Sequence, residues 1–420
     1  MRTEVGLKCP KHAAVPDSAL PRRRRSGRVA ALGAAVVVIA LLAIILAIKL
    51  GSTPGRNLPP VGTTYGSWQN LTGMSDIRGS TTAVRLTDGR VLVAGGGDGN
   101  VALSGTDVFN PTSNTWASGG AMNEARRGNE TVLLKDGRVL TAGGLQGSTV
   151  LASAEIWNPA TSAWTLTAPM HTARLNQILI SLADGRVLAA GGLVSASSTT
   201  SSAEVYDPAA NTWTVVPGGM LQSRSDAGSA LLDGGRVLIA GGYSQTTGAT
   251  PNPLSETELF DPAASLFVRG PSMVNQRADL TLTRLQNGEV LAAGGFSSSA
   301  VLNTAERYDP ASSTWNLVAG MSQQREQASA SLLPNGYVLV SAGESADVAN
   351  GVLSSRTSLT TAEVYKPSTN QWLETSAMHC PRSTQAQVTL SSGTALVVGG
   401  EGLSPGAGVA HQNCAELYTP

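Results

Sequence analysis

Seven copies of one sequence pattern fill the chain from about residue 78 to its end. In each copy an apolar stretch ends in a glycine pair or its remnant, and four of the six spacings between successive pairs are 48 to 50 residues. The pairs are Gly95-Gly96, Gly143-Gly144, Gly191-Gly192, Gly241-Gly242, Gly294-Gly295, Ala342-Gly343 and Gly399-Gly400. A fixed period of this length is typical of propellers and other repeat arrays. The repeat is therefore taken as the structural unit.

Each unit reads as four short strands, called a to d. A tight-turn dipeptide such as Asp88-Gly89 precedes the apolar stretch, as expected for a two-residue hairpin between strands a and b. A variable loop follows the glycine pair, then strand c ending near Asn/Asp-Pro, then strand d with an aromatic residue. Composition agrees, because 47 glycines and only 14% charged residues favour turn-rich β structure over a helical bundle. Four strands per unit predict one propeller blade.

The two ends of the repeat region predict how the ring closes. The last unit stops after its third strand at residues 415–420, whereas Trp68 precedes the first complete unit. The N-terminal strand would therefore supply the missing fourth strand of the last blade and remove a free sheet edge. The fold class that follows is all-β: a seven-bladed propeller of four-stranded blades over residues 61–420.

The DGRVLxAGG, xAExYDP and NTW elements of these units resemble kelch repeats. Seven of them resemble the seven-bladed propeller of galactose oxidase, and the resemblance covers residues 61–420. It implies the fold far more than a function, since kelch propellers serve as enzymes, adaptors and glycan binders.

The first sixty residues differ from the repeats. Residues 29–48 are apolar and long enough to cross a bilayer, and five arginines precede them within 22–28. We therefore expect a basic cytoplasmic tail (1–28), a transmembrane signal-anchor helix (29–48), a linker (49–60) and an extracytoplasmic propeller, in a single-pass membrane protein of a bacterium. A cleaved signal peptide is the alternative. Residues 1–50 hold nine basic and two acidic residues and the remainder 20 basic and 27 acidic, which argues against nucleic-acid binding.

Every unit also carries an arginine four residues after a methionine and one acid at the start of strand c. The arginines are Arg78, Arg126, Arg174, Arg224, Arg277, Arg325 and Arg382, and the acids are Asp107, Glu155, Glu204, Glu258, Glu306, Glu363 and Glu416. Strands a and c run in the same direction, so both sets lie at one face. We predict seven structural ion pairs, in preference to a ring of free guanidiniums for an anionic ligand.

The positions of the cysteines and histidines predict one disulfide bridge and no metal site. Cys380 and Cys414 start strands a and c of the last blade, and we predict a disulfide between them, which an extracytoplasmic compartment allows. The copper site that the galactose oxidase resemblance would imply needs two histidines, two tyrosines and a cysteine crosslinked to one tyrosine. The tyrosines here are strand-c repeat residues and no free cysteine stands near them, so we expect neither metal nor cofactor.

Residues that differ between units are the candidates for ligand binding. The b–c loops of units four, six and seven are enlarged and offer Tyr243, Arg356 and His411, although tolerated insertion would also explain them. A second set follows the repeated arginines on the innermost strand, where alternate residues face the channel; ordinary solvated lining is the alternative. This set comprises Arg127, Asn129, Glu130, Asn176, Gln177, Asp226, Asp279, Glu326, Gln327 and Gln387.

These features favour a membrane-anchored binding or adhesion propeller for a glycan or protein partner, and a binding function over catalysis. One alternative is a sugar isomerase or mutarotase working in the channel, as some extracytoplasmic kelch propellers do, which needs two carboxylates and a free arginine converging there. The other is a structural scaffold of the cell envelope.

Overall fold

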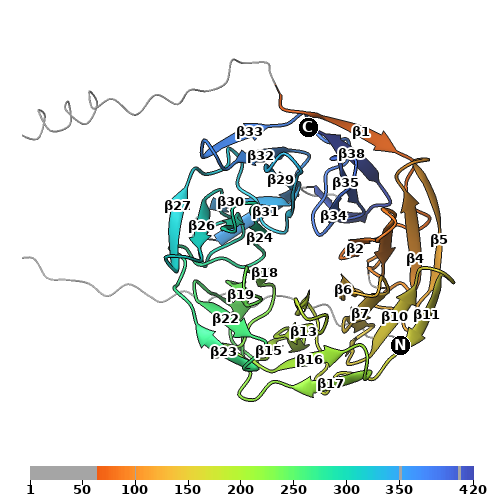
Figure 1. Ribbon diagram of the computed structural model, residues 1–420. Helices are drawn as coiled ribbons and strands as arrows, with labels where there is room; N and C mark the ends of the chain where they lie inside the picture. Colours follow the sequence, from red (N-terminus) through yellow and green to blue (C-terminus); the bar gives the residue numbers. More distant parts are fainter. Residues whose placement is uncertain (1–63, 100, 350–351, 405–407) are drawn as a thin grey trace, which may run out of the picture. The chain divides into compact units, whose positions relative to one another are not determined.

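Residues 64–99, 101–349, 352–404 and 408–420 are described by a computed structural model. They form seven four-stranded antiparallel sheets arranged as blades around a central channel (Figure 1). Blades one to three are β2(Thr82–Arg85), β3(Val91–Ala94), β4(Gly105–Asn110), β5(Thr115–Ala121); β6(Glu130–Leu133), β7(Val139–Ala142), β10(Ala154–Asn158), β11(Ala163–Leu166); and β12(Ile178–Ser181), β13(Val187–Ala190), β16(Ala203–Asp207), β17(Thr212–Val215). Blades four and five are β18(Gly228–Leu231), β19(Val237–Ala240), β22(Thr257–Asp261), β23(Leu266–Arg269); and β24(Thr281–Arg284), β25(Val290–Ala293), β26(Ala305–Asp309), β27(Thr314–Val318). Blades six and seven are β28(Ser329–Leu332), β29(Val338–Ser341), β32(Ala362–Lys366), β33(Gln371–Glu374); and β34(Ala386–Thr389), β35(Ala395–Val398), β38(Ala415–Thr419), β1(Ser67–Leu71).

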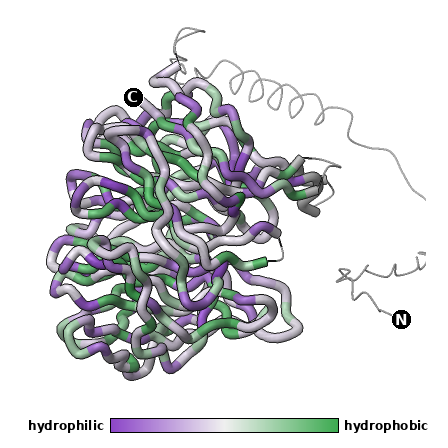
Figure 2. The backbone as a smooth tube through the Cα atoms, turned by 90° about the vertical axis from the view of Figure 1, so that its right-hand side faces the viewer, coloured by the Kyte–Doolittle hydropathy of each residue, from purple (hydrophilic) through white to green (hydrophobic). Residues whose placement is uncertain are grey.

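The hydrophobic core lies between neighbouring blades. Strand b is buried along its whole length in every blade, because each of its faces packs against a sheet. One cluster, for example, joins Leu188 and Val205 of blade three to Val237, Ile239 and Phe260 of blade four. Hydrophobic and hydrophilic stretches accordingly alternate along the whole tube in Figure 2. The apolar run before each glycine pair is thus explained by burial on both sides.

The glycine pairs connect each blade to the next. The second glycine N–H of every pair donates to the carbonyl of the repeated arginine in the following blade, and Gly400 returns to Arg78. These seven hydrogen bonds are 2.8–2.9 Å long. At Gly241 φ is +67°, and a Cβ there would lie 2.3 Å from the Arg277 carbonyl oxygen. Glycine is required because the next blade's backbone approaches so closely.

The ring closes as the sequence predicts. β1 pairs antiparallel with β38, which places Trp68 opposite Tyr418 with ring centroids 5.1 Å apart. In Figure 1 the first strand, in orange, lies beside the last, in dark blue. The disulfide between Cys380 and Cys414 is present in the same blade, which confirms that prediction.

Seven residues in the left-handed region of φ, one per blade, form a further ring around the channel. They are Ser80, Gly128, Asn176, Asp226, Asp279, Gln327 and Thr384, with φ of +49° to +59°. Six backbone hydrogen bonds of 3.1–3.3 Å join successive members, and the seventh runs from the Ser80 N–H to the Thr384 hydroxyl (3.2 Å). Gly, Asn and Asp adopt this conformation most readily, and they occupy four of the seven positions.

Among the described residues there is no helix long and apolar enough to span a membrane. The predicted tail (1–28), signal-anchor helix (29–48) and linker (49–60) lie outside the described residues. The helix and the membrane topology therefore stay predictions.

Candidate binding site in the propeller channel

The propeller has two unlike faces. The a–b and c–d turns form one, called the turn face; the b–c loops and the repeated arginines form the other, called the loop face. Short hairpins occupy five b–c loops: β8(Leu145–Gln146)–β9(Thr149–Val150), β14(Leu193–Ser195)–β15(Ser198–Thr199), β20(Tyr243–Ser244)–β21(Asn252–Pro253), β30(Glu344–Ala349)–β31(Val352–Ser358) and β36(Glu401–Ser404)–β37(Gly408–His411). The three enlarged loops are thus β-hairpins. Ser358 links the last two hairpins, since its hydroxyl donates to the Glu401 carbonyl (3.0 Å) and accepts from the Leu403 N–H (2.8 Å).

The repeated arginines are fully buried, and each contacts the acid of its own unit. The seven contacts, 2.6–3.2 Å long, are Arg78–Asp107, Arg126–Glu155, Arg174–Glu204, Arg224–Glu258, Arg277–Glu306, Arg325–Glu363 and Arg382–Glu416. Each guanidinium also donates to two backbone carbonyls, as Arg224 does to Gly241 and Glu256. Because these guanidiniums are buried and paired within their own blades, they serve the scaffold.

Within each unit the acid also holds the turn that leads into strand a. Glu204 accepts from the backbone N–H of His171 (2.7 Å) and of Thr172 (3.0 Å), and the His171 Nδ1 lies 2.9 Å from the same carboxylate. Burial raises the pKa of Glu204, but the hydrogen bonds from His171 and Arg174 outweigh it and leave that pKa below its ordinary value. His379 contacts Glu416 in the same way at 2.8 Å. These two histidines therefore belong to the scaffold.

The channel contains a polar pocket of about 340 Å³ near the loop face. Its acids are Glu130, Asp226 and Asp279, its amides Asn129, Asn176, Gln177, Gln327 and Gln385, and its hydroxyls Ser80, Thr81, Thr82, Ser329 and Thr384. No lysine, arginine or histidine lines this pocket. Seven of the predicted channel residues thus lie together, and the ionisable side chains among them are all acids.

Asp226 is the best-connected acid of the channel. Its two oxygens accept from the Asn176 amide (2.9 Å) and the Ser225 hydroxyl (2.6 Å). Burial raises the pKa of Asp226 to about 6, although hydrogen bonds from Ser225, Tyr243 and Asn176 lower it. Tyr243 comes from the enlarged loop of unit four, where its backbone bridges that of Ser225. Burial and the charges of Asp226 and Asp279 raise the pKa of Tyr243 well above its ordinary value, so its hydroxyl stays protonated.

Three more charged residues, Asp279, Glu326 and Arg356, complete the group at the mouth. Burial, followed by the charges of Asp226 and Glu326, raises the pKa of Asp279. Arg356, on β31, lies 3.2 Å from Glu326 and 3.6 Å from Glu344. Tyr243, Asp226, Asp279, Glu326 and Arg356 are called the mouth cluster below. It brings residues of both predicted candidate sets together.

Of the other predicted residues, Asn176 contacts Asp226 directly, and Asn129 and Glu130 line the same pocket as Asp226 and Asp279. The Arg127 guanidinium donates to the Gly99 carbonyl, and the buried Asn129 amide donates to the Thr141 hydroxyl (2.9 Å). Glu130 lies further along strand a in the channel, and burial, then the charge of Asp226, raises its pKa to about 8. His411 lies 3.9 Å from Glu401 on the seventh blade. Arg127 and Asn129 are used within the fold and are left out of the proposed site.

Sequence reasoning missed Glu344, Glu401 and Ser383. Ser383 donates to Glu344 (2.7 Å), and Ser80 donates to Glu401 (3.2 Å). Both acids follow directly after a glycine pair, a position held by glycine, leucine or an aromatic residue in the other units. This break in the repeat was the signal that could have found them.

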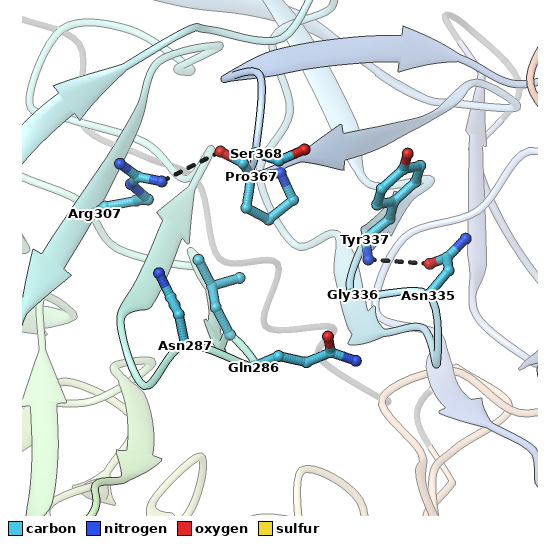
Figure 3. A pocket seen from close by; sticks show the side chains of 9 residues that line it. Gln286, Asn287, Arg307, Asn335, Gly336, Tyr337, Pro367 and Ser368 are labelled. Atoms are coloured by element: carbon cyan, nitrogen blue, oxygen red, sulfur yellow. Dashed lines mark hydrogen bonds between the residues drawn. The ribbon is translucent and has the colours of Figure 1, made fainter.

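Grooves on the turn face form a second kind of pocket. The one in Figure 3, of about 270 Å³, lies between blades five and six, where Arg307 donates to the Pro367 carbonyl (3.5 Å) and Asn335 accepts from the Tyr337 N–H (3.0 Å). It lacks the converging acids of the channel. The mouth of the channel is therefore the better candidate site.

The donor set does not fit a copper site like that of galactose oxidase. Both cysteines of the described residues form the disulfide, and His171 and His379 face the scaffold acids. Tyr206, Tyr308 and Tyr365 are buried in the blades against tryptophans. Within the described ranges no three His, Cys, Asp or Glu residues are grouped so that they could hold a metal ion.

Comparisons with known proteins agree with this architecture. The Kelch motif matches residues 78–123, 126–171, 181–220 and 285–322. The curated protein sequences give no significant match. Among solved structures, a fungal alcohol oxidase of the AA5 family in complex with copper is 19% identical, with a TM-score of 0.68 over 84% of this chain and 76% of that chain. The repeats, the seven blades and this shared fold identify residues 64–420 as a kelch-repeat β-propeller.

Proposed function

We propose that this protein is a membrane-anchored binding protein whose propeller lies outside the cytoplasm and holds a glycan or protein partner at the loop face. Kelch propellers commonly mediate protein interactions. Binding residues on such scaffolds come from loops held by a rigid frame. The mouth cluster has this arrangement, with loop residues placed over a polar channel.

The observation that carries the proposal is the position of Tyr243 and Arg356. Both come from enlarged loops that break the repeat, and both lie near carboxylates that precede strand a, Asp226 and Asp279 for Tyr243 and Glu326 for Arg356. Insertions that were merely tolerated would have no reason to converge there. The polar lining of the pocket, with its amides, hydroxyls and acids, suits a ligand rich in hydrogen-bonding groups.

Membrane anchoring is supported by the sequence of residues 29–48 and the arginines before it. The disulfide in blade seven fits an oxidising compartment. The test is cysteine labelling of Cys9 in intact cells: a membrane-impermeant reagent should leave it unlabelled until the cells are opened. Labelling in intact cells would reverse the proposed topology.

Ligand binding is tested by thermal unfolding of the full-length protein in detergent with neutral sugars, sialic acids and cell-wall fragments. A ligand at a hundredfold excess over its Kd stabilises the folded state by about 2.7 kcal/mol. Arg356→Gln and Tyr243→Phe should reduce the shift, whereas Asp98→Asn, an exposed acid on the loop of blade one, should not. A shift that survives both mouth variants would place the ligand elsewhere.

A sugar isomerase or mutarotase is the second candidate, favoured by two carboxylates whose charges both act on Asp279. Asp226 and Glu326 have pKa values raised by burial to about 6 and about 7, so acid and base forms coexist near neutrality. Arg356 is engaged with Glu326 and Glu344, so the free arginine that this function needs is not met in the unliganded chain. Catalysed exchange of sugar anomers, measured by NMR and abolished by Asp226→Asn, would favour this candidate.

A further inference from the structure

At one level of the channel pocket the wall has a polar side and an apolar side. The third residue after the repeated arginine lines the pocket in every blade. This residue is polar in blades seven, one, two and three (Gln385, Thr81, Asn129, Gln177) and apolar in blades four, five and six (Ala227, Leu280, Ala328). Because successive blades are neighbours around the closed ring, each run forms one side of the wall (Figure 1). The lining is therefore amphipathic, although the backbone that carries it repeats seven times.

Two glutamines of the polar side have an acceptor without a donor. Gln177 and Gln385 line the pocket and are 4% and 5% exposed. Each donates its amide N–H to strand b of the preceding blade, Gln177 to the Ala142 carbonyl (2.7 Å) and Gln385 to the Ser341 carbonyl (3.0 Å). Within the described residues the amide oxygen of each accepts no hydrogen bond. Buried acceptors without donors are costly, so this pocket favours a ligand that brings donors.

A pyranose ring matches both features of the pocket. Its hydroxyl groups project from the edge of the ring and donate as well as accept hydrogen bonds, whereas the C–H groups of its faces are apolar. Ala227, Leu280 and Ala328 offer an apolar surface to such a face. The pocket volume of about 340 Å³ lies within the range of about 300–1,000 Å³ that small-molecule sites occupy. A wholly apolar ligand would leave the glutamine oxygens without donors.

The charge of the pocket restricts the class of sugar. The ionisable side chains among its lining residues are Glu130, Asp226 and Asp279, all of them acids. A sugar that carries a carboxylate would lie beside like charges, which costs binding energy. A neutral sugar avoids this repulsion, and its hydroxyls can donate to the carboxylates in charge-assisted hydrogen bonds.

We propose that the channel pocket binds one neutral pyranose residue, with a C–H face on Ala227, Leu280 and Ala328 and its hydroxyls toward Gln177 and Gln385. The inference rests on the proposed binding function and names the class of its ligand. Asp226 and Asp279 belong both to the mouth cluster and to the pocket lining, so the pocket lies directly below that cluster. The sugar residue would enter from the loop face.

The experiment is titration calorimetry on the full-length protein in a detergent without a sugar headgroup. The probes are the methyl β-pyranosides of glucose, galactose and N-acetylglucosamine, with the methyl β-pyranosides of glucuronate and galacturonate as carboxylate-bearing counterparts. Burial raises the pKa of Asp226 to about 6, so at pH 8 this acid is ionised. At that pH at least one neutral probe should bind, roughly tenfold or more tightly than either uronate.

Two variants exchange residues that the repeat already accommodates at this position. Gln177→Leu places the blade-five residue in blade three, and Leu280→Gln places the blade-three residue in blade five. Each should weaken binding of the neutral probe roughly tenfold, the first by removing an acceptor and the second by removing apolar surface. The matched control is Gln286→Leu, since Gln286 donates to the Pro334 carbonyl (3.0 Å) on the turn face, away from this pocket. It should leave binding unchanged, and unfolding curves check that all three variants fold.

Three results would overturn the inference: a uronate that binds as tightly as its neutral counterpart, a neutral probe whose binding both pocket variants leave unchanged, or binding of none of the neutral probes. In each case a thermal shift with cell-wall fragments that Arg356→Gln reduces would leave the proposed binding function standing, with the mouth cluster alone as its site. The absence of any such shift would overturn the glycan-binding function as well.

Discussion

At the scale of single residues, the buried arginines make the strongest demand on the fold. Arg277 is fully buried and donates to Gly294, Thr304 and Glu306. Arg277→Met would leave the Glu306 carboxylate buried without its counter-charge, so we expect the free energy of unfolding to fall by about 3–5 kcal/mol. Denaturant titration measures the loss. Arg90→Met, which breaks a partly exposed pair with Asp88, should cost no more than about 1 kcal/mol, and equal losses would contradict the structural role.

Glu130 gives a pH dependence of stability with a definite sign. Burial raises its pKa from about 4.5 to about 8, so the folded protein binds the proton more tightly than the unfolded chain. The preference of the folded state for protonated Glu130 contributes fully to the free energy of unfolding below pH 4.5, and this contribution is lost as the pH rises to 8. Glu130→Gln should therefore gain stability relative to the wild type from pH 5 to pH 8, as read from denaturant midpoints. A difference that does not change with pH would show that Glu130 ionises normally.

Repetition decides which residue contacts could be predicted from the sequence. The arginine–acid pairs could be predicted because one spacing recurs in seven units, and burial makes the same demand in each. The contact of Arg356 with Glu326 and Glu344 could not, because Arg356 occurs once and its position depends on the path of a long hairpin. Channel-facing residues could be predicted only as a set from strand alternation.

At the scale of elements, blade seven is assembled from both ends of the repeat region and carries the disulfide. Cys380 and Cys414 are 34 residues apart, and closing a loop of that size stabilises by roughly 3–4 kcal/mol through the unfolded chain. The double variant Cys380→Ala/Cys414→Ala should lose about that much in denaturant unfolding. Reductant should then lower the stability of the wild type to that of the variant and leave the variant unchanged. A wild type insensitive to reductant would contradict this role.

The structure of the b–c loops could not be predicted from the sequence. Their lengths identified units four, six and seven as enlarged, but length alone does not distinguish an irregular insertion from a hairpin. β30–β31 and β36–β37 are fixed partly by each other, through the Ser358 hydroxyl and the Glu401 backbone. Such contacts join residues 43 positions apart, beyond the reach of local propensity.

At the scale of the whole molecule, closure couples all seven blades. Every blade donates a glycine N–H to the next, and the last donates to Arg78 of the first, so these hydrogen bonds form a closed circle through all seven blades. Closure could be predicted from the sequence because the last unit lacks a fourth strand and one extra strand precedes the first unit. The ring of left-handed residues around the channel could not be predicted. It joins equivalent residues of different blades and leaves no local pattern beyond a preference for polar residues and glycine.

Deleting residues 61–72 tests this coupling. The deletion removes β1 and Trp68, which packs on Tyr418 and in a core cluster shared by blades six and seven. It exposes the edge of β38, and blade seven in turn packs on blade one through Val91, Phe109 and Leu396. Blade seven packs against blades six and one, so losing β1 destabilises its neighbours on both sides. Amide hydrogen exchange should therefore accelerate in strand b of all seven blades, and unfolding should stay a single transition with a lower midpoint. Deleting residues 49–60, of equal length, should change neither. Faster exchange confined to blade seven would show that the blades unfold independently and that closure is a local contact.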